Sequence, residues 1–187
     1  IRNLVIHTRR PGLTEQVSAS DNQLCQVQNR APASFWITNP QNEFSGNVAA
    51  GTPGTGFWLI FPLKGVLFPS SVDSKNEVIP GAEVIAEWAK DREPRKSALK
   101  LFEDNVAHSC GSGFDVNDGI VTRLDDPARE HFIQANAHWK RPFNEGYDIV
   151  RFTAYGCYDA IYTGPVTITS PIRYVDCTLA DNVQNLR

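Results

Sequence analysis

The chain has 187 residues, of which 41% are hydrophobic and 21% are charged, enough for one domain with a hydrophobic core. Its formal net charge of −3 argues against nucleic-acid binding, which requires a basic surface. No apolar run approaches the ~20 residues of a membrane-spanning helix. We therefore expect neither a nucleic-acid partner nor a membrane span in this segment.

The first residues, IRNLVIHT, are typical of a strand, and the chain contains no methionine. The last residues, LADNVQNLR, show no capping helix. We therefore expect the chain to be a fragment of a longer protein, with a processed mature chain as the alternative.

One sequence pattern occurs twice, and two looser copies follow it. Residues 46–61 read GNVAAGTPGTGFWLIF, and residues 104–118 read DNVAHSCGSGFDVND. Residues 153–157 and, more weakly, residues 173–177 align beneath them. Short strands separated by turns, repeating every ~20–30 residues, are typical of a solenoid. Four glycines are expected to give the turns their positive φ angles: Gly54, Gly56, Gly111 and Gly113.

The pattern predicts an all-β, right-handed parallel β-helix in which successive coils stack ~4.8 Å apart. Equivalent positions on each coil then share one environment. We expect Ala49, Ala107 and Ala154 to lie in register inside the helix. Asn47 and Asn105 would occupy a bend, where their side chains can hydrogen-bond to each other along the helix axis.

Two insertions are expected to interrupt this single domain of residues 1–187. The first spans about residues 62–98 and contains GAEVIAEWAKDRE, whose apolar spacing predicts a short α-helix. The second spans about residues 121–145 and is rich in charge. Loops that project from a regular scaffold commonly carry function.

The alignment places three of the four cysteines, Cys110, Cys157 and Cys177, in one column with Thr52, and leaves Cys25 outside it. Neighbouring coils hold Cα atoms within the ~4.4–6.8 Å that a disulfide tolerates, so a Cys157–Cys177 bridge is allowed. A stack of buried thiols acting as small hydrophobes is the alternative.

Three residues are candidates for catalysis. His108 stands where other copies have Ala50 and Tyr155, and it could serve as a general base or contact a sugar. Asp115 and Asp118 could share acid–base work or hold calcium, the one cofactor considered. The ordinary alternatives are a histidine hydrogen-bonded within the wall and an acidic turn.

Four residues are candidates for glycan binding, because sugar rings stack on aromatic faces and anionic sugars attract cations. Trp36 and Tyr155 could point outward from strands, whereas Trp58, in a continuous apolar run, is expected in the core. Trp139 and Arg141, in the stretch HWKRP, suit an anionic polysaccharide. Core packing and a solvated loop are the ordinary alternatives.

The stretch ASFWITNPQNEFSGNVAAGTPGTGFWLIF, residues 33–61, resembles the β-helix region of fibrocystin-type proteins and of hyaluronan-binding and hyaluronan-depolymerising proteins at the cell surface. Residues 101–114, which contain NVAHS, are similar to a later element of that group, and residues 150–182 match more loosely. The resemblance implies a β-helix, an extracellular or cell-surface setting and association with glycans. It carries over no catalytic residue.

The leading expectation is therefore an extracellular module that binds glycans or supports adhesion. Its partners would be a polysaccharide or a glycoprotein glycan and other parts of the same larger protein. The alternative is a polysaccharide lyase, hydrolase or epimerase that works in a groove along the helix. A purely structural assembly module, whose stacked ends join further chains, is the third hypothesis.

Overall fold

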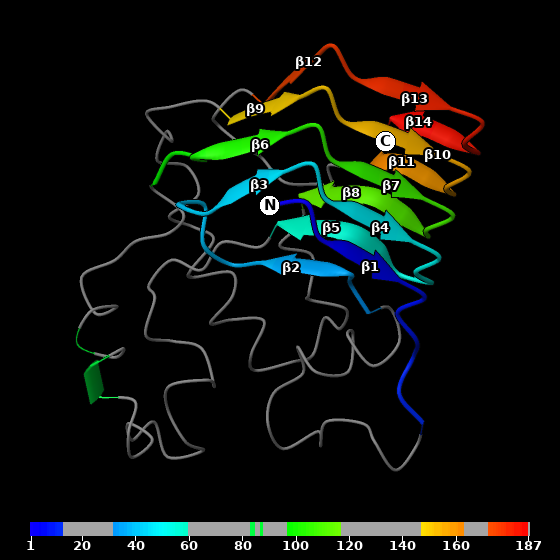
Figure 1. Ribbon diagram of the computed structural model, residues 1–187. Helices are drawn as coiled ribbons and strands as arrows, with labels where there is room; N and C mark the ends of the chain where they lie inside the picture. Colours follow the sequence, from blue (N-terminus) through cyan, green and yellow to red (C-terminus); the bar gives the residue numbers. More distant parts are fainter. Residues whose placement is uncertain are drawn as a thin grey trace, which may run out of the picture.

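The computed structural model describes residues 1–12, 32–59, 83–84, 87, 97–116, 147–162 and 172–186. Within these ranges the chain forms short strands joined by tight bends (Figure 1). The strands are β1 (Leu4–Ile6), β2 (Phe35–Ile37), β3 (Glu43–Ser45), β4 (Val48–Ala50), β5 (Thr55–Leu59), β6 (Leu101–Glu103), β7 (Val106–His108), β8 (Ser112–Val116), β9 (Tyr147–Val150), β10 (Thr153–Tyr155), β11 (Asp159–Tyr162), β12 (Ile172–Val175), β13 (Thr178–Ala180) and β14 (Gln184–Leu186).

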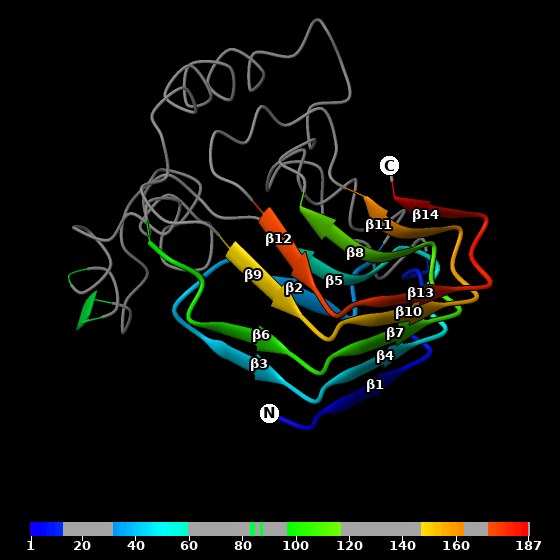
Figure 2. The ribbon, with the colours of Figure 1, turned by 90° about the horizontal axis from the view of Figure 1, so that it is seen from above.

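The described strands form three parallel sheets. Sheet A has the order β1-β4-β7-β10-β13, sheet B has the order β14-β11-β8-β5-β2, and sheet C has the order β12-β9-β6-β3. From β3 onward the chain visits sheets C, A and B in turn, so each coil adds one strand to each sheet (Figure 2). This is the expected right-handed parallel β-helix.

The three alanines predicted to share one interior column do so. Ala49, Ala107 and Ala154 pair in register on β4, β7 and β10, and each is fully buried. The space between sheets A and B is narrow here, because a Cβ added at Gly113, on sheet B, would lie 3.1 Å from the Cβ of Ala154 on sheet A. A Cβ added at Gly56 would lie 3.1 Å from the Cβ of Ala107 on sheet A, and 2.7 Å from the carbonyl oxygen of Gly113 within sheet B. These glycines are therefore required for close packing.

Sheets B and C enclose an aromatic core on the other side of the coil. Phe57, Phe102, Phe114 and Phe152 are all at most 1% exposed. The rings of Phe57 and Phe102 meet edge to face at 5.4 Å, and those of Phe102 and Phe114 at 5.3 Å. Side chains from consecutive coils thus interlock in the core.

Each coil turns twice through a residue with left-handed backbone. The bend from sheet C to sheet A uses Arg2, Gly46, Asp104, Arg151 and Asp176. The bend from sheet A to sheet B uses His7, Gly51, Ser109, Gly156 and Asp181. The prediction that Gly54, Gly56, Gly111 and Gly113 have positive φ angles was wrong. At the first bend the residue with positive φ directly precedes Asn47 or Asn105, and at the second bend it directly follows the strand of sheet A. Coil-to-coil hydrogen bonds such as Asp104 N to Val150 O, at 3.0 Å, offset the strain.

Beside the first bend, stacked asparagines form the predicted ladder. Both the backbone and side-chain nitrogens of Asn47 donate to Asn105 Oδ1, at 2.9 and 2.8 Å. Asn3 donates in the same way to Asn47 Oδ1, twice at 3.0 Å. The ladder satisfies polar groups that would otherwise be costly to bury.

The long connections from β5 to β6, from β8 to β9 and from β11 to β12 all run from sheet B to sheet C. The expected insertions, about residues 62–98 and 121–145, fall almost entirely outside the described residues. Of the expected helix only Glu83, Val84 and Glu87 are described, and their backbone is helical. Nowhere in the described ranges is there a helix of the length and apolarity needed to cross a membrane.

Candidate functional site

The outer face of sheet A carries an aromatic pair. Register places Ile6, Ala50, His108, Tyr155 and Ala180 in one outward column on five successive strands. The rings of His108 and Tyr155 lie 4.8 Å apart and are within 8° of parallel. The two candidates from sequence thus lie together, on adjacent coils.

The surroundings of this pair are uncharged and open. Tyr155 is 43% exposed, and Tyr158, in the following bend, is 54% exposed. The neighbouring outward column of sheet A consists of Leu4, Val48, Val106, Thr153 and Thr178. His108 Nδ1 lies 3.4 Å from Ser109 Oγ. This face can stack on the apolar face of a sugar ring and supply hydrogen bonds beside it.

The outer face of sheet B carries a second aromatic group with a carboxylate. Trp36, Trp58, Asp115 and Tyr162 form one column across β2, β5, β8 and β11. Their neighbours Phe57 and Phe114 point into the core, so this column faces outward. The indole rings of Trp36 and Trp58 stack at 5.5 Å with 20° between their planes.

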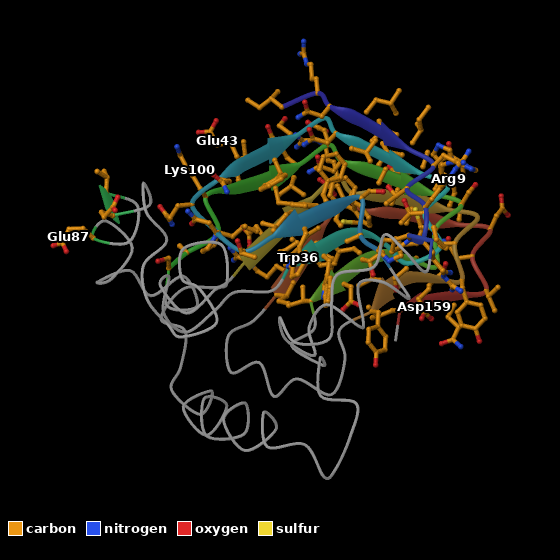
Figure 3. All side chains as sticks on the ribbon, turned by 90° about the horizontal axis from the view of Figure 1, so that it is seen from below. Arg9, Trp36, Glu43, Glu87, Lys100 and Asp159 are labelled. Atoms are coloured by element: carbon orange, nitrogen blue, oxygen red, sulfur yellow. The ribbon has the colours of Figure 1, made fainter. Side chains whose placement is uncertain are left out.

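Burial distinguishes this column from the one on sheet A. Trp36 is 37% exposed, whereas Trp58 and Asp115 are 6% and 9% exposed although they face outward. Trp58 is therefore buried as predicted, but on the outer face of its sheet. A second buried carboxylate, Asp159 at 8% exposure, lies on the adjacent strand β11 (Figure 3).

Sequence reasoning missed Asp159. Asp159 pairs with Ser112, whereas Asp115 pairs with Tyr162. Asp159 therefore lies three residues nearer the start of its strand than the position opposite Asp115. Aligning Ala154 with Ala107 gives these same pairings, so no repeated position or motif marks Asp159 in the sequence.

The two catalytic candidates within the described ranges, His108 and Asp115, lie on different faces of the coil. His108 faces outward from sheet A, whereas Asp115 faces outward from sheet B. Asp118, Trp139 and Arg141 lie outside the described residues, as does Cys25. Within the described ranges no group of three or more acidic, histidine or cysteine side chains is arranged to hold a metal ion.

The outer face of sheet C is ionic. Lys100 Nζ lies 2.9 Å from Glu43, and Arg173 Nε lies 2.6 Å from Asp148. At the bend into sheet A, Arg151 donates to Asp104 at 2.6 and 2.8 Å. This hydrogen-bonded guanidinium lowers the pKa of Asp104. These basic side chains are thus already neutralised by acidic neighbours.

The predicted cysteine column was wrong at its last member. Because Thr153 pairs with Thr178, Cys157 lies opposite Asn182, and its backbone N–H donates to Asn182 Oδ1 at 2.9 Å. Cys177, directly before Thr178, instead continues the asparagine column. Cys110, Cys157 and Cys177 are all free thiols, and the proposed Cys157–Cys177 bridge is not formed.

The corrected column is a ladder of hydroxyl and thiol groups. Thr8 Oγ1 lies 3.1 Å from Ser34 Oγ, which contacts Thr52 Oγ1. Cys110 and Cys157 follow on the next two coils. A hydrogen bond with the Cys157 thiol lowers the pKa of Cys110 to about 7, and the same bond raises the pKa of Cys157.

Comparison with known proteins gave two matches. The family model described as CEMIP beta-helix matches residues 1–114. A protein of Dictyostelium discoideum is 28% identical over 107 residues, which are 57% of this chain and 8% of the relative. The chain therefore spans only a small part of that relative's length. No solved structure matched. Since the family model covers more than half of the residues, and the coils it covers form the expected solenoid, this chain belongs to the CEMIP β-helix family.

Proposed function

We propose that this chain is an extracellular β-helix module that binds a polysaccharide on the outer face of sheet A. The observation that carries the proposal is the parallel ring pair formed by the half-buried His108 and the exposed Tyr155. Membership of a hyaluronan-related β-helix family supports both the glycan ligand and the extracellular or cell-surface setting.

The geometry suits a chain of sugars that lies along the helix axis. Because the two rings stack on each other, the ring faces left for a sugar are the face of His108 toward Ala50 and the face of Tyr155 toward Ala180. A chain of sugars that crosses successive coils could stack on these two faces on either side of the ring pair. The apolar side chains of Val48 and Val106 flank the rings and would contact the C–H faces of adjacent sugars. Aromatic residues combine a large apolar surface with little side-chain entropy, which favours them as binding anchors.

The uncharged character of this face predicts how binding responds to salt. Ion pairs exposed to solvent are screened by electrolyte, whereas ring stacking is not. We therefore expect affinity for hyaluronan oligosaccharides to change little between low and physiological salt. A steep loss with salt would place recognition on basic residues elsewhere.

Substitution of Tyr155 tests the proposal directly. Tyr155→Ala removes the exposed ring and should weaken binding at least about tenfold, or about 1.4 kcal/mol, in calorimetric titration with hyaluronan and with a neutral polysaccharide. Tyr155→Phe keeps the ring and should retain binding. Arg173→Ala, on sheet C, is the control for a distant surface. Unchanged affinity in Tyr155→Ala would refute the site, and no binding to any polysaccharide would favour a structural assembly module.

A polysaccharide-cleaving enzyme is the second candidate, and the outer face of sheet B favours it. There Trp36 and Trp58 stack next to Asp115, with Asp159 on the adjacent strand. Glycoside hydrolysis uses two carboxylates, and Asp115 and Asp159 are the two acidic residues on the described strands of sheet B. Loss of hyaluronan viscosity on incubation, abolished by Asp115→Asn and kept by His108→Ala, would support this candidate. Constant viscosity with the intact chain would exclude it for that polymer.

A further inference from the structure

The bend between sheets A and B holds Cys110 and Cys157 directly above one another. The strands before them are locked in register, His108 opposite Tyr155. Backbone bonds bracket the two cysteines, from Ser109 N to Tyr155 O and from Tyr158 N to Cys110 O, each 3.1 Å long. Both side chains are buried, at 4% and 3% exposure. The two thiols have no freedom to separate while the coils remain stacked.

We propose that Cys110 and Cys157 are a cross-linking site, at which a disulfide oxidant joins the coil β6–β7–β8 to the coil β9–β10–β11. Adjacent parallel strands lie ~4.8 Å apart, within the range of Cα separations that disulfides span. The structure shows the reduced form of this pair. The inference does not depend on glycan binding.

The chemistry is thiol–disulfide exchange with a small disulfide such as oxidised glutathione. The Cys110 thiolate attacks one sulfur of the oxidant and releases one thiolate. The Cys157 thiolate then attacks the mixed disulfide at Cys110, forms the Cys110–Cys157 bond and releases the second thiolate. The two cysteine protons end on the two released thiols, and the oxidant takes up two electrons.

The interaction between the two stacked thiols assigns the order of attack. Because it lowers the pKa of Cys110 to about 7, Cys110 is the stronger source of thiolate at neutral pH. The same interaction raises the pKa of Cys157, so Cys157 keeps its proton while Cys110 is the thiolate, and it attacks second. Burial shields both sulfurs in the folded state, so exchange should proceed fastest during folding, after the two coils have stacked and while the bend is still open to the oxidant.

The bond would act across one of the long connections of the solenoid, where closing the coil costs chain entropy. Residues 117–146 separate β8 from β9, so closing this coil is costly. A link between residues 110 and 157 encloses that entire connection and constrains the unfolded chain. Cys177 has no cysteine opposite it. Because Thr153 pairs with Thr178, the residue at the level of Cys177 on the neighbouring coil is Phe152.

Peptide mapping after oxidative refolding tests the proposal. The full chain is refolded with reduced and oxidised glutathione, remaining thiols are alkylated, and the unreduced digest is analysed by mass spectrometry. We expect one peptide pair joined through Cys110 and Cys157, with Cys177 alkylated. Free thiols at both positions, a glutathione adduct that persists, or a bond that involves Cys25 or Cys177 would overturn the proposal.

Matched variants separate the bond from general folding effects. Threonine already occupies the equivalent position one coil earlier, at Thr52. The fold should therefore tolerate Cys110→Thr. Reductant should lower the unfolding temperature of the wild type and of Cys177→Ser by more than about 5 °C. It should leave that of Cys110→Thr unchanged. An equal response to reductant in all three proteins would contradict the inference.

Discussion

Sheets A and C stand on the same coils, yet their outer faces differ in kind. Sheet A presents an uncharged surface with the His108–Tyr155 pair, whereas sheet C presents ion pairs such as Arg173–Asp148. Inward, both sheets contribute buried apolar side chains, Ala107 from sheet A and Phe102 from sheet C. The interior therefore determines the register of the coil, and the outer face of each sheet is free to carry a different function.

Disruption of the interior should unfold the coils and so remove the outer surfaces of sheets A and C together. We expect this effect on stability to be the largest. Gly113→Ala would place a methyl group 2.6 Å from the Ala160 carbonyl oxygen and 3.1 Å from the Ala154 side chain. We expect it to lower the free energy of unfolding by about 3 kcal/mol in urea titrations. Thr153→Val, on the outer face of sheet A, is the control and should change little. Equal stability of the two variants would contradict the packing described between sheets A and B.

The bend between sheets C and A is the next most sensitive place. Asn105→Ala removes the acceptor of two hydrogen bonds from Asn47 and leaves those nitrogens buried. The expected cost is about 2 kcal/mol in the free energy of unfolding. Asn42→Ala, at an exposed position, provides the comparison. A cost below that of Asn42→Ala would show that the ladder is dispensable.

The inner side of sheet C offers a smaller test with the opposite sign. The hydroxyl oxygen of Tyr174 is buried without a hydrogen-bond partner in the described structure, and burial raises the pKa of this group. Tyr174→Phe removes an uncompensated polar atom and keeps the ring. Its stability should equal or exceed that of the wild type by up to about 1 kcal/mol in thermal unfolding. A clear destabilisation would reveal a partner for the hydroxyl.

The ionic bend next to sheet C should give the smallest effect. Hydrogen bonds from Arg151 lower the pKa of Asp104, so their contribution to stability is present above the unfolded-state pKa of about 3.9. It is lost as pH falls through the lower folded-state value. In Asp104→Asn, the free energy of unfolding should therefore fall less steeply as the pH is lowered from neutral to acid. The urea midpoint measured at each pH tests this. Its glycan affinity should equal that of the wild type, and a loss of affinity would erase the distinction between the faces.

The coil could be predicted because the same interior positions require the same kinds of side chain on successive coils. Ala49 and Ala107, beside Asn47 and Asn105, mark the position at which small side chains and a hydrogen-bonding bend are required. The last coil was misaligned because these markers change there. Phe152 and then Cys177 replace the asparagine, and Leu179 replaces the alanine, so the cysteines gave a false register.

The sites were harder to predict because packing does not require similar side chains at the outward positions of successive coils. Trp36 and Asp115 are far apart in sequence, and only the pairing of β2, β5 and β8 brings them into one column. Asp159 carries no motif and was found only by register. His108 and Tyr155 were each singled out for chemistry, but their ring contact follows from coil stacking.

Amide shifts on addition of hyaluronan oligosaccharides, followed by nuclear magnetic resonance, test the central claim most directly. The account predicts that perturbations concentrate on β7 and β10, around His108 and Tyr155, and spare β9 and β12 on sheet C. Perturbations confined to sheet C, or to Asp148 and Arg173, would contradict it.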